Sequence, residues 1–345
     1  MNNERKALSR EEIINVIEGK GHASRIPTYY HGWMHPHVFG EDRELAEKYL
    51  RDYPFDFEKI TIMLPDKYNA PSDDPSFRFM HRDPLPDEVE NKALDAQTAL
   101  QMEEIDDMIA DFPDPNYHAI WEQKLGEKTK YRVLYMWFTL FERHWWLRGM
   151  ENALTDYYEY PEETHKLYQA FTNFYIKLIQ NSKKYYDIDG FFITDDIGTQ
   201  KYPFFSIEIF REFFKPYYSQ IVKAAHEVGV HVWLHTCGNV TSFIEDFIDI
   251  GFDVLHPIQK YSMDEVEVAR RFGDRITILA GFDVQQIIPN GTPEDVRREV
   301  RHLIDTYSRK EGRLIMTLGN EATCDFPIEN LYALLDETYN YGMGK

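Results

Sequence analysis

The sequence contains very little cysteine: Cys237 and Cys324 are the only two in 345 residues. Two cysteines cannot build the disulfide framework that holds small secreted domains together. A chain of this length can bury a large hydrophobic core and does not need such a framework. Both thiols are therefore available for other chemistry, and a reducing, cytoplasmic location is expected.

Long apolar runs are also missing. The sequence has no stretch of about 18 apolar residues, the length that a membrane-spanning helix requires. The amino-terminal segment, MNNERKALSREEIINVIEGK, is charged and has no apolar signal core. We therefore expect no association with a membrane.

Basic residues are outnumbered by acidic ones. Lys and Arg total 38 against 59 Asp and Glu, which gives a net charge of −21 at pH 7. Such an acidic surface repels the phosphates of nucleic acids and anionic lipids, so nucleic-acid binding is not expected. Aromatic residues, in contrast, reach 15%, and either a bulky core or an aromatic pocket would account for them.

Glycine-rich phosphate loops of the GxGxxG or P-loop type do not occur. Instead, short apolar segments alternate with helical ones, which is typical of a parallel sheet covered by helices. Eight strands are predicted, at residues 25–31, 59–64, 131–138, 190–198, 231–238, 254–259, 276–283 and 314–321. Eight strand–helix units predict an α/β fold, a single (β/α)8 TIM barrel over residues 1–345. An open doubly wound sheet is the alternative, but its first strand usually ends in the missing glycine-rich loop.

Residues 66–128 interrupt this alternation after the second predicted strand. They begin as a polar, proline-rich stretch and continue as an acidic amphipathic helix. An insertion at this point lies on the catalytic face of a barrel, where such segments often act as lids or docking surfaces. We expect a helical insertion with that role, or one without function.

Polar side chains collect at the carboxyl ends of the predicted strands, where barrel enzymes place their chemistry. They are His31, Asp195, Asp196, His235, Cys237, His256, Gln259, Asp283, Asn320 and Glu321, with Cys324 shortly after the last strand. Asp195 and Asp196 are adjacent, so only one of them is expected to face the interior. The pattern predicts an active site rather than a passive rim.

His235 and Cys237 are two residues apart on a predicted strand, so their side chains point to the same face. Gly238 allows a sharp turn directly afterwards. A closed barrel brings distant strand ends to one mouth, so Cys324 can reach the same point. One imidazole and two thiolates suit zinc, and three protein ligands leave the open position of a catalytic site. Without a metal, Cys237 would be a small buried residue and His235 a core histidine.

Four stretches resemble motifs of the uroporphyrinogen decarboxylase superfamily, and more narrowly of its cobalamin-dependent zinc methyltransferase branch. They are FERHWWLRGMENAL at 141–154, DDIG at 195–198, HTCGNV at 235–240 and GNEATCDFPIEN at 319–330. The branch includes methylcobamide:coenzyme M methyltransferases and the methyltransferases of O-demethylases. The resemblance implies zinc on His235, Cys237 and Cys324, and a cobalamin (corrinoid) cofactor carried by a partner protein. It covers the chain from about residue 25 and is weakest in 66–128.

One stretch departs from the decarboxylases of this superfamily. Those resemble one another in an arginine-rich stretch after the first strand, of the pattern RQAGRY, which serves a polycarboxylate substrate. The corresponding residues 29–40, YYHGWMHPHVFG, contain no arginine. Because burying carboxylates without cations is costly, decarboxylation is the alternative from another enzyme class rather than the first expectation.

The resemblance implies an enzyme that moves a methyl group from a small methoxylated substrate, which the aromatic content suggests is aromatic, to cob(I)alamin, with zinc polarising the ether oxygen. The reverse reaction, from methylcobalamin to a thiol, would use the same ligands. A corrinoid- or metal-binding module without turnover is a further alternative. The predicted catalytic residues are Asp195, Asp196 and Glu321, and the predicted substrate-binding residues are Tyr30, His31, Trp33, Trp137 and His256, with Tyr29 as a further aromatic candidate.

Overall fold

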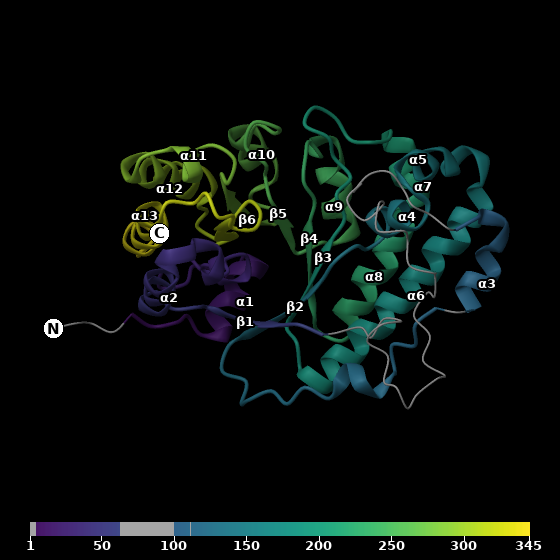
Figure 1. Ribbon diagram of the computed structural model, residues 1–345, viewed down its shortest axis with the longest axis horizontal. Coiled ribbons are helices and arrows are strands. Elements are labelled where there is room, and N and C mark those ends of the chain that lie inside the picture. The colour runs from purple at the N-terminus through teal and green to yellow at the C-terminus, as the bar shows by residue number, and fades with distance from the viewer. Residues whose placement is uncertain (1–4, 63–99, 111) are drawn as a thin grey trace.

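The computed structural model describes residues 5–62, 100–110 and 112–345. Its centre is a curled sheet of seven parallel strands that follow one another in sequence order (Figure 1). The strands are almost entirely buried, because the barrel interior lies on one side and helices cover the other. This is the predicted TIM-barrel-like α/β fold. The strands are β1 (Phe57–Ile60), β2 (Tyr131–Met136), β3 (Gly190–Thr194), β4 (His231–His235), β5 (Val254–His256), β6 (Thr277–Phe282) and β7 (Leu314–Leu318).

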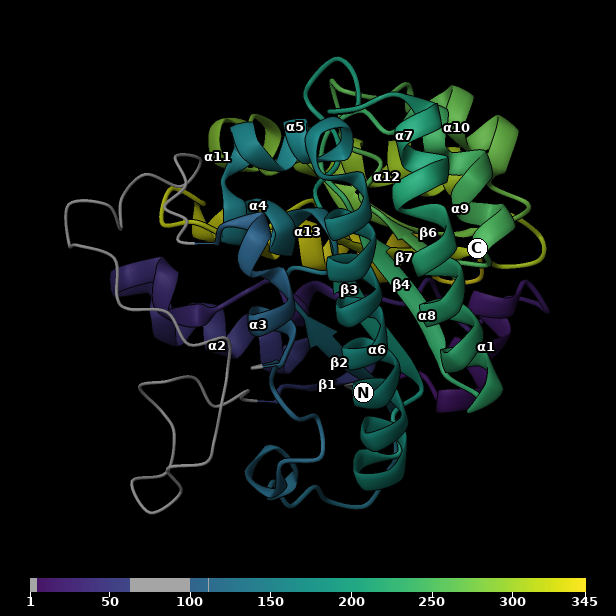
Figure 2. The same cartoon turned by 90° about the vertical axis from the view of Figure 1, so that its right-hand side faces the viewer.

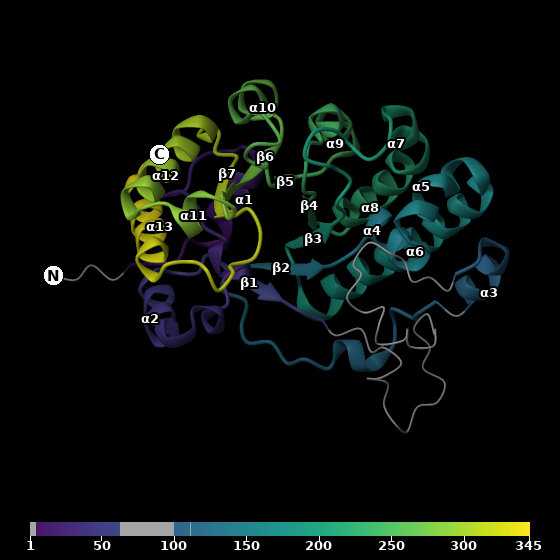
Figure 3. The same ribbon diagram turned by 45° about the horizontal axis from the view of Figure 1, so that its top comes forward.

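Helices cover the outer face of the sheet. Figure 2 shows α6 beside α8 outside the middle strands, and Figure 3 shows α12 beside α13 near β6 and β7. In the part of the chain that the structure describes, no helix combines the length and the apolar composition needed to cross a membrane. The helices are α1 (Arg10–Glu18), α2 (Arg43–Asp52), α3 (Ile105–Ala110), α4 (Phe141–Arg148), α5 (Met150–Glu159), α6 (Pro161–Tyr186), α7 (Ile207–Phe213), α8 (Lys215–Glu227), α9 (Ile244–Ile250), α10 (Glu265–Phe272), α11 (Ile287–Asn290), α12 (Pro293–Tyr307) and α13 (Ile328–Tyr341).

The first predicted strand, residues 25–31, is wrong as a regular strand. This segment makes a single parallel bridge, from Thr28 to Met316 of β7. On its other side, the carboxylate of Asp56 accepts a hydrogen bond of 2.9 Å from the backbone N–H of Thr28. Pro27 has no N–H to offer a ladder, and the chain then turns into the 3-10 helix η1 (Tyr30–Gly32). The side chain of Asp56 therefore connects this segment to the start of β1, in place of backbone pairing between two strands.

The other predicted strands are present with different ends. β1 begins at Phe57, two residues before its predicted start, and predicted residues 63 and 64 lie outside the described residues. β3 and β4 end earlier than predicted, at Thr194 and His235. The residues that follow these strand ends are therefore on loops, which are free to turn toward one another.

The predicted insertion at 66–128 falls partly on residues 66–99 and 111, which lie outside the described residues. Its described part contains α3 and the short 3-10 helices η3 (Met102–Glu104) and η4 (His118–Trp121). α3 packs against α6, and the ring of Trp121 stacks on Tyr185 of α6 at 5.3 Å. This part is anchored to the outer layer of helices. Its role as a lid or docking surface stays a prediction.

Aromatic rings fill the interior of the barrel. Tyr29, Phe57, Phe192 and Trp233 are all buried. The ring of Phe57 lies 5.3 Å from Tyr29 and 5.5 Å from Trp233, both in the edge-to-face arrangement that aromatic pairs prefer. Tyr29, one candidate for an aromatic pocket, is therefore part of the core.

Candidate metal centre

The candidate site begins with a row of side chains across three strands. The strand register pairs Thr194 of β3 with His235 of β4, and His235 with His256 of β5. Residues paired in this way project to the same face of a sheet. Both histidines are buried, and their Nδ1 atoms lie 2.7 Å apart.

His256 is predicted to bind substrate, but both of its ring nitrogens are engaged within the protein. Its Nδ1 contacts His235, and its Nε2 donates a hydrogen bond of 2.8 Å to the carbonyl oxygen of Leu318 at the end of β7. The structure therefore leaves His256 no nitrogen for a substrate and places it behind His235.

Three potential metal ligands converge at the carboxyl ends of β3 and β4. The Nε2 atom of His235 lies 3.4 Å from the Sγ of Cys237 and 3.5 Å from the Oδ1 of Asp196. The ligand atoms of all three residues lie within 4.8 Å of one another. Zinc binds nitrogen, sulfur and oxygen ligands at roughly 2.0–2.3 Å, so small shifts would bring all three onto one ion. The donor set and its spacing fit zinc.

The turn after β4 places Cys237. Its backbone N–H donates a hydrogen bond of 2.7 Å to the Oδ1 of Asp196. Gly238 follows in the left-handed region with φ 84°, and a Cβ at this position would come within 2.3 Å of the carbonyl group of Gly198. Glycine is needed here because the two loops cross at backbone contact distance. The turn expected at Gly238 is present.

Burial disfavours the charged forms of both Cys237 and His235. Burial, and then the negative charge of Asp196, raise the pKa of the Cys237 thiol well above its ordinary value. Burial lowers the pKa of His235, so its ring is neutral near pH 7. A bound cation would reverse the effect on the thiol, because positive charge favours the thiolate.

The two adjacent aspartates have different surroundings. Asp195 is buried, and its carboxylate accepts hydrogen bonds from the backbone N–H groups of residues 140–142 and from the hydroxyl of Tyr218. It caps the start of α4. Asp196 instead faces His235 and Cys237. Of the two predicted catalytic aspartates, the structure brings only Asp196 to the metal centre.

Glu142 is a carboxyl group near the centre for which the sequence predicts no role. It is buried, and its Oε2 accepts a hydrogen bond of 2.7 Å from the hydroxyl of Thr194. Burial and the negative charges of Asp196 and Asp195 raise the pKa of Glu142 to about 9, so the group is protonated at neutral pH. Its only signal in the sequence was its place in the FERH stretch.

The loop after β7 carries Glu321 and Cys324, and both side chains are exposed. Cys324 does not belong to the group of described residues whose ligand atoms lie within 4.8 Å of one another. The side-chain amide of Asn320 lies 3.9 Å from the Sγ of Cys237, while Glu321 lies 4.0 Å from the Nε2 of His35. The loop thus reaches the centre through Asn320, and Cys324 stays a predicted ligand.

Two of the predicted substrate-binding aromatic residues lie beside the centre. The buried ring of Trp33 is 5.2 Å from the ring of His256 and 5.4 Å from that of His235. Trp137, which is 43% exposed, packs its edge against Trp33 at 6.3 Å. Together these two rings form an apolar wall next to His235.

The other two predicted substrate-binding residues point elsewhere. The hydroxyl of Tyr30 hydrogen-bonds at 2.9 Å to Thr338 on α13. The Nε2 of His31 hydrogen-bonds at 3.0 Å to the carbonyl oxygen of Leu50 on α2. Both residues connect η1 to the outer helices and are not brought to the metal centre.

A cavity of about 60 Å³ opens beside Cys237. Two charged residues line it: Lys260 is paired with Glu299 at 2.6 Å and Glu265 at 3.1 Å, and Asp283 accepts the backbone N–H of Gln285 at 3.0 Å. The cavity adjoins the thiol, so it offers a place for a small substrate. Its lining comprises Cys237, Pro257, Gln259, Lys260, Gly281, Phe282, Asp283, Val284, Gln285, Gly319 and Asn320.

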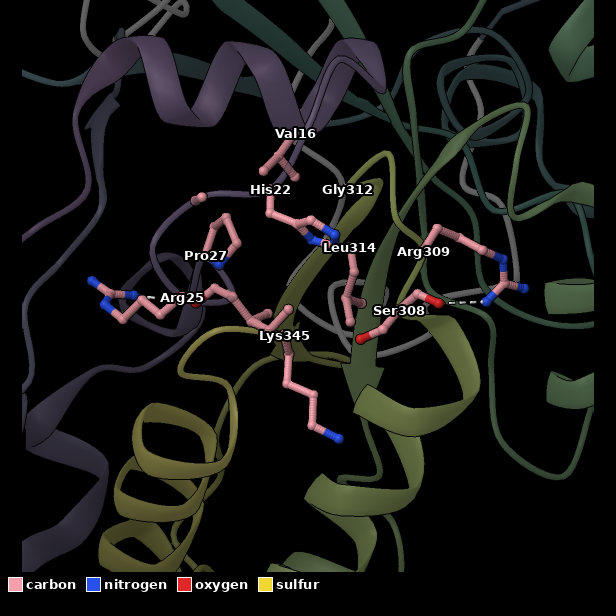
Figure 4. A pocket seen from close by; sticks show the side chains of 11 residues that line it. Val16, His22, Arg25, Pro27, Ser308, Arg309, Gly312, Leu314 and Lys345 are labelled. Carbon is pink, nitrogen blue, oxygen red and sulfur yellow. Dashed lines mark hydrogen bonds between the residues drawn. The ribbon is translucent and has the colours of Figure 1, made fainter.

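A second cavity lies at the opposite end of the barrel, near the start of β7 (Figure 4). Its volume of about 10 Å³ is room for about one water molecule. The charged side chains around it already have partners: Arg25 binds Asp56, and Lys345 binds Asp305. This end of a barrel ordinarily serves stability, and nothing here indicates a site.

Comparison with known proteins gives two curated relatives from Methanosarcina mazei. The methylcobamide:CoM methyltransferase MtbA is 27% identical over 143 residues, which cover 41% of this chain and 40% of the relative. The methylated-thiol–coenzyme M methyltransferase is 27% identical over 190 residues, which cover 54% of this chain and 47% of the relative. Each match thus spans less than half of the relative's length.

Among solved structures, a methyltransferase from Methanosarcina mazei superposes with a TM-score of 0.60 over 96% of this chain and 98% of its own, at 14% identity. At that identity the likeness shows the fold alone. The sequence profile of the uroporphyrinogen decarboxylase (URO-D) family matches residues 146–341, more than half of the chain. The chain therefore belongs to the uroporphyrinogen decarboxylase family.

Proposed function

We propose that this protein is a zinc-dependent methyltransferase that exchanges a methyl group between a small methylated substrate and a corrinoid on a partner protein. The observation that carries the proposal is the convergence of His235, Cys237 and Asp196, whose ligand atoms lie within 4.8 Å of one another at two adjacent strand ends. The names of the two curated relatives, both methyltransferases, support the reaction class.

His235 and Cys237 would hold the zinc ion, with Asp196 as the third ligand in the arrangement described above. The resemblance implies Cys324 in that third place. Either set of three protein ligands leaves a position for the substrate. A bound zinc ion would supply a Lewis acid for the negative charge that develops on the substrate heteroatom as its methyl group leaves.

The chain's own residues prepare this position. Asp196 fixes the turn that carries Cys237 by accepting its backbone N–H at 2.7 Å. Trp33 and Trp137 form an apolar wall next to His235, which would exclude water from the methyl group and pack against it.

For the methyl donor we propose a methoxylated compound. The carbon–oxygen bond would break with its electron pair on oxygen, while cob(I)alamin supplies the electron pair for the new bond to the methyl carbon. The partial exposure of Trp137 supports an aromatic donor, because aromatic rings pack well against one another. Asp196 would accept a hydrogen bond from a hydroxyl on such a donor.

Transfer from methylcobalamin to a thiol is the second candidate. It is favoured by the small cavity beside Cys237 and by the methylated thiol in the name of one relative. The same ligands would serve, because a cation lowers the pKa of a thiol and produces the nucleophilic thiolate.

Decarboxylation of a polycarboxylate fits the site poorly. The carboxylate of Asp196 lies 3.5 Å from His235 at the centre, and Glu321 lies on the exposed loop after β7. A substrate with several carboxylates would be repelled there rather than neutralised.

The proposal is tested by incubating zinc-loaded protein with cob(I)alamin and a panel of methoxylated compounds, and with methylcobalamin and a panel of thiols. Each reaction is followed by the cobalt absorption spectrum. We expect conversion with at least one partner and its loss in Cys237→Ala. Zinc-loaded protein that converts no member of either panel would favour the binding module without turnover.

A further inference from the structure

A row of hydrogen bonds runs behind His235, away from the metal centre. The carbonyl oxygen of Leu318 on β7 lies 2.8 Å from the Nε2 of His256 on β5. The Nδ1 of His256 lies 2.7 Å from the Nδ1 of His235 on β4. All the side chains in the row are buried, so water does not compete for these contacts.

The donor and the acceptor of each hydrogen bond in the row can be assigned. A carbonyl oxygen can only accept a hydrogen bond, so the Nε2 of His256 carries a proton. A second proton on that ring would charge a buried group that has no carboxylate partner in the row, which is costly. The Nδ1 of a neutral His256 is therefore an acceptor, and the Nδ1 of His235 must donate to it. The Nε2 of a neutral His235 is then left with a free lone pair.

The other tautomer of His235 has a ready partner as well. With its proton on Nε2, His235 could donate to the Oδ1 of Asp196, 3.5 Å away. That arrangement would use the nitrogen that faces Cys237 and block it as a ligand. The short contact with His256 favours the tautomer of His235 that carries its proton on Nδ1. Trp33 packs against the rings of His256 and His235 at 5.2 and 5.4 Å, which limits their rotation.

We propose that His256 is a positioning residue that holds His235 in the tautomer whose Nε2 is unprotonated and ready to bind a metal. The inference deepens the proposed function and rests on it, because both require that the ion binds at His235 and Cys237. Metal-binding histidines generally donate their second N–H to such a partner, and loss of the partner lowers metal affinity about 10–100-fold. Here the partner is a second histidine that is itself fixed by a backbone carbonyl.

The tautomer is tested first in metal-free protein, so that the result does not depend on zinc. Long-range proton–nitrogen correlation spectra of protein with 15N-labelled histidine show which ring nitrogen carries the proton. The signals of His235 are those lost in His235→Ala. We expect the proton on Nδ1 of His235 and on Nε2 of His256. A proton on Nε2 of His235 would overturn the inference.

Zinc affinity is tested next, by competition with a chromophoric chelator. We expect His256→Phe, which fills the space but cannot accept a hydrogen bond, to bind zinc about 10–100-fold more weakly. His256→Gln should recover most of the affinity, because its amide can accept from His235 and donate to Leu318. His231→Phe, at the other end of β4, is the matched control and should bind as the wild type does.

The outcomes separate this inference from the proposed function. A folded His256→Phe variant with unchanged zinc affinity would overturn the role of His256. If His256→Phe does not fold, the tautomer of the wild-type protein still decides. A wild-type protein that takes up no zinc would overturn the metal centre, while the tautomer spectrum would still report on His256.

Discussion

The backbone N–H of Cys237 donates a hydrogen bond of 2.7 Å to the Oδ1 of Asp196. This contact connects the loop after β4 to the loop after β3. It also holds a carboxylate oxygen 3.5 Å from the Nε2 of His235. With the Nε2 of His235 unprotonated, as proposed above, two lone-pair-bearing atoms face each other, and a cation between them would relieve their repulsion.

Asp196→Asn and Asp195→Asn should affect different properties of the protein. Asp196→Asn removes a ligand charge at the centre, so zinc affinity should fall by about 10-fold or more with little change in stability. Asp195→Asn puts an amide against the backbone N–H groups at the start of α4, so the free energy of unfolding should fall by about 2 kcal/mol. Chelator competition and urea denaturation measure the two effects. Unchanged zinc affinity in Asp196→Asn, together with a loss in Cys324→Ser, would assign the third ligand to Cys324 instead.

Gly238→Ala should destabilise the protein more than Gly229→Ala. Both glycines have positive φ, 84° and 70°, so both variants carry about 1 kcal/mol of backbone strain. Only at Gly238 would the new Cβ also overlap the backbone of Gly198, at 2.3 Å, while nothing lies within 4 Å of Gly229. We therefore expect Gly238→Ala to lose at least about 1 kcal/mol more in urea denaturation, and to bind zinc more weakly. Equal losses in both variants would show that the loops after β3 and β4 can move apart without a loss of stability.

Asp56→Ala should be among the most destabilising single changes in the barrel. Its carboxylate is buried, binds Arg25 through two contacts of 2.8 and 2.5 Å, and accepts the N–H of Thr28. Removing it leaves a buried guanidinium without its carboxylate partner, at a cost of about 3–5 kcal/mol. Asp52→Ala, which breaks an exposed pair with Lys48, should cost less than about 1 kcal/mol. Similar thermal shifts for the two variants would contradict this role of Asp56.

In Glu12→Gln, the free energy of unfolding should fall less than in the wild type as the pH becomes acidic. Burial acts to raise the pKa of Glu12, but the backbone N–H groups of Ser9 and Ser24 outweigh it and lower the pKa from 4.5 to about 2. Because the folded pKa is the lower one, the stabilisation is present above pH 4.5 and is lost as the pH falls toward 2. After allowance for solvent screening, we expect an advantage of the wild type over Glu12→Gln of about 1 kcal/mol at pH 7. Urea denaturation at pH 7, 5, 4 and 3 should show it shrinking, and a difference that grows with acid would contradict the assignment.

Much of the fold, and the positions of His235 and Cys237 in the site, follow from local sequence patterns. The alternation of strands and helices predicted the barrel class. The two-residue spacing of His235 and Cys237, followed by Gly238, predicted two neighbouring side chains on one face and a tight turn, and the structure has both. Their role as metal ligands stays a prediction. The adjacency of Asp195 and Asp196 predicted that only one would face the interior. These inferences need only the periodicity of a strand and the conformational freedom of glycine.

The rest depends on contacts between distant segments, which spacing does not encode. Asp196 reaches the centre through the N–H of Cys237, and His256 supports His235 through the strand register. The segment at 25–31 fails as a strand because the side chain of Asp56 takes the place of a backbone partner. Cys324 is exposed on the loop after the last strand, and its place among the ligands stays a prediction.

The most direct test of the metal centre is the zinc content of the purified protein by elemental analysis. We expect about one zinc per chain in the wild type and in His231→Phe, as for a single catalytic site. His235→Ala and Cys237→Ala should each retain less than about a tenth of that amount, because each loses one of three ligands. Wild-type zinc content in both of these variants, or no zinc in the wild type, would contradict the assignment of this centre.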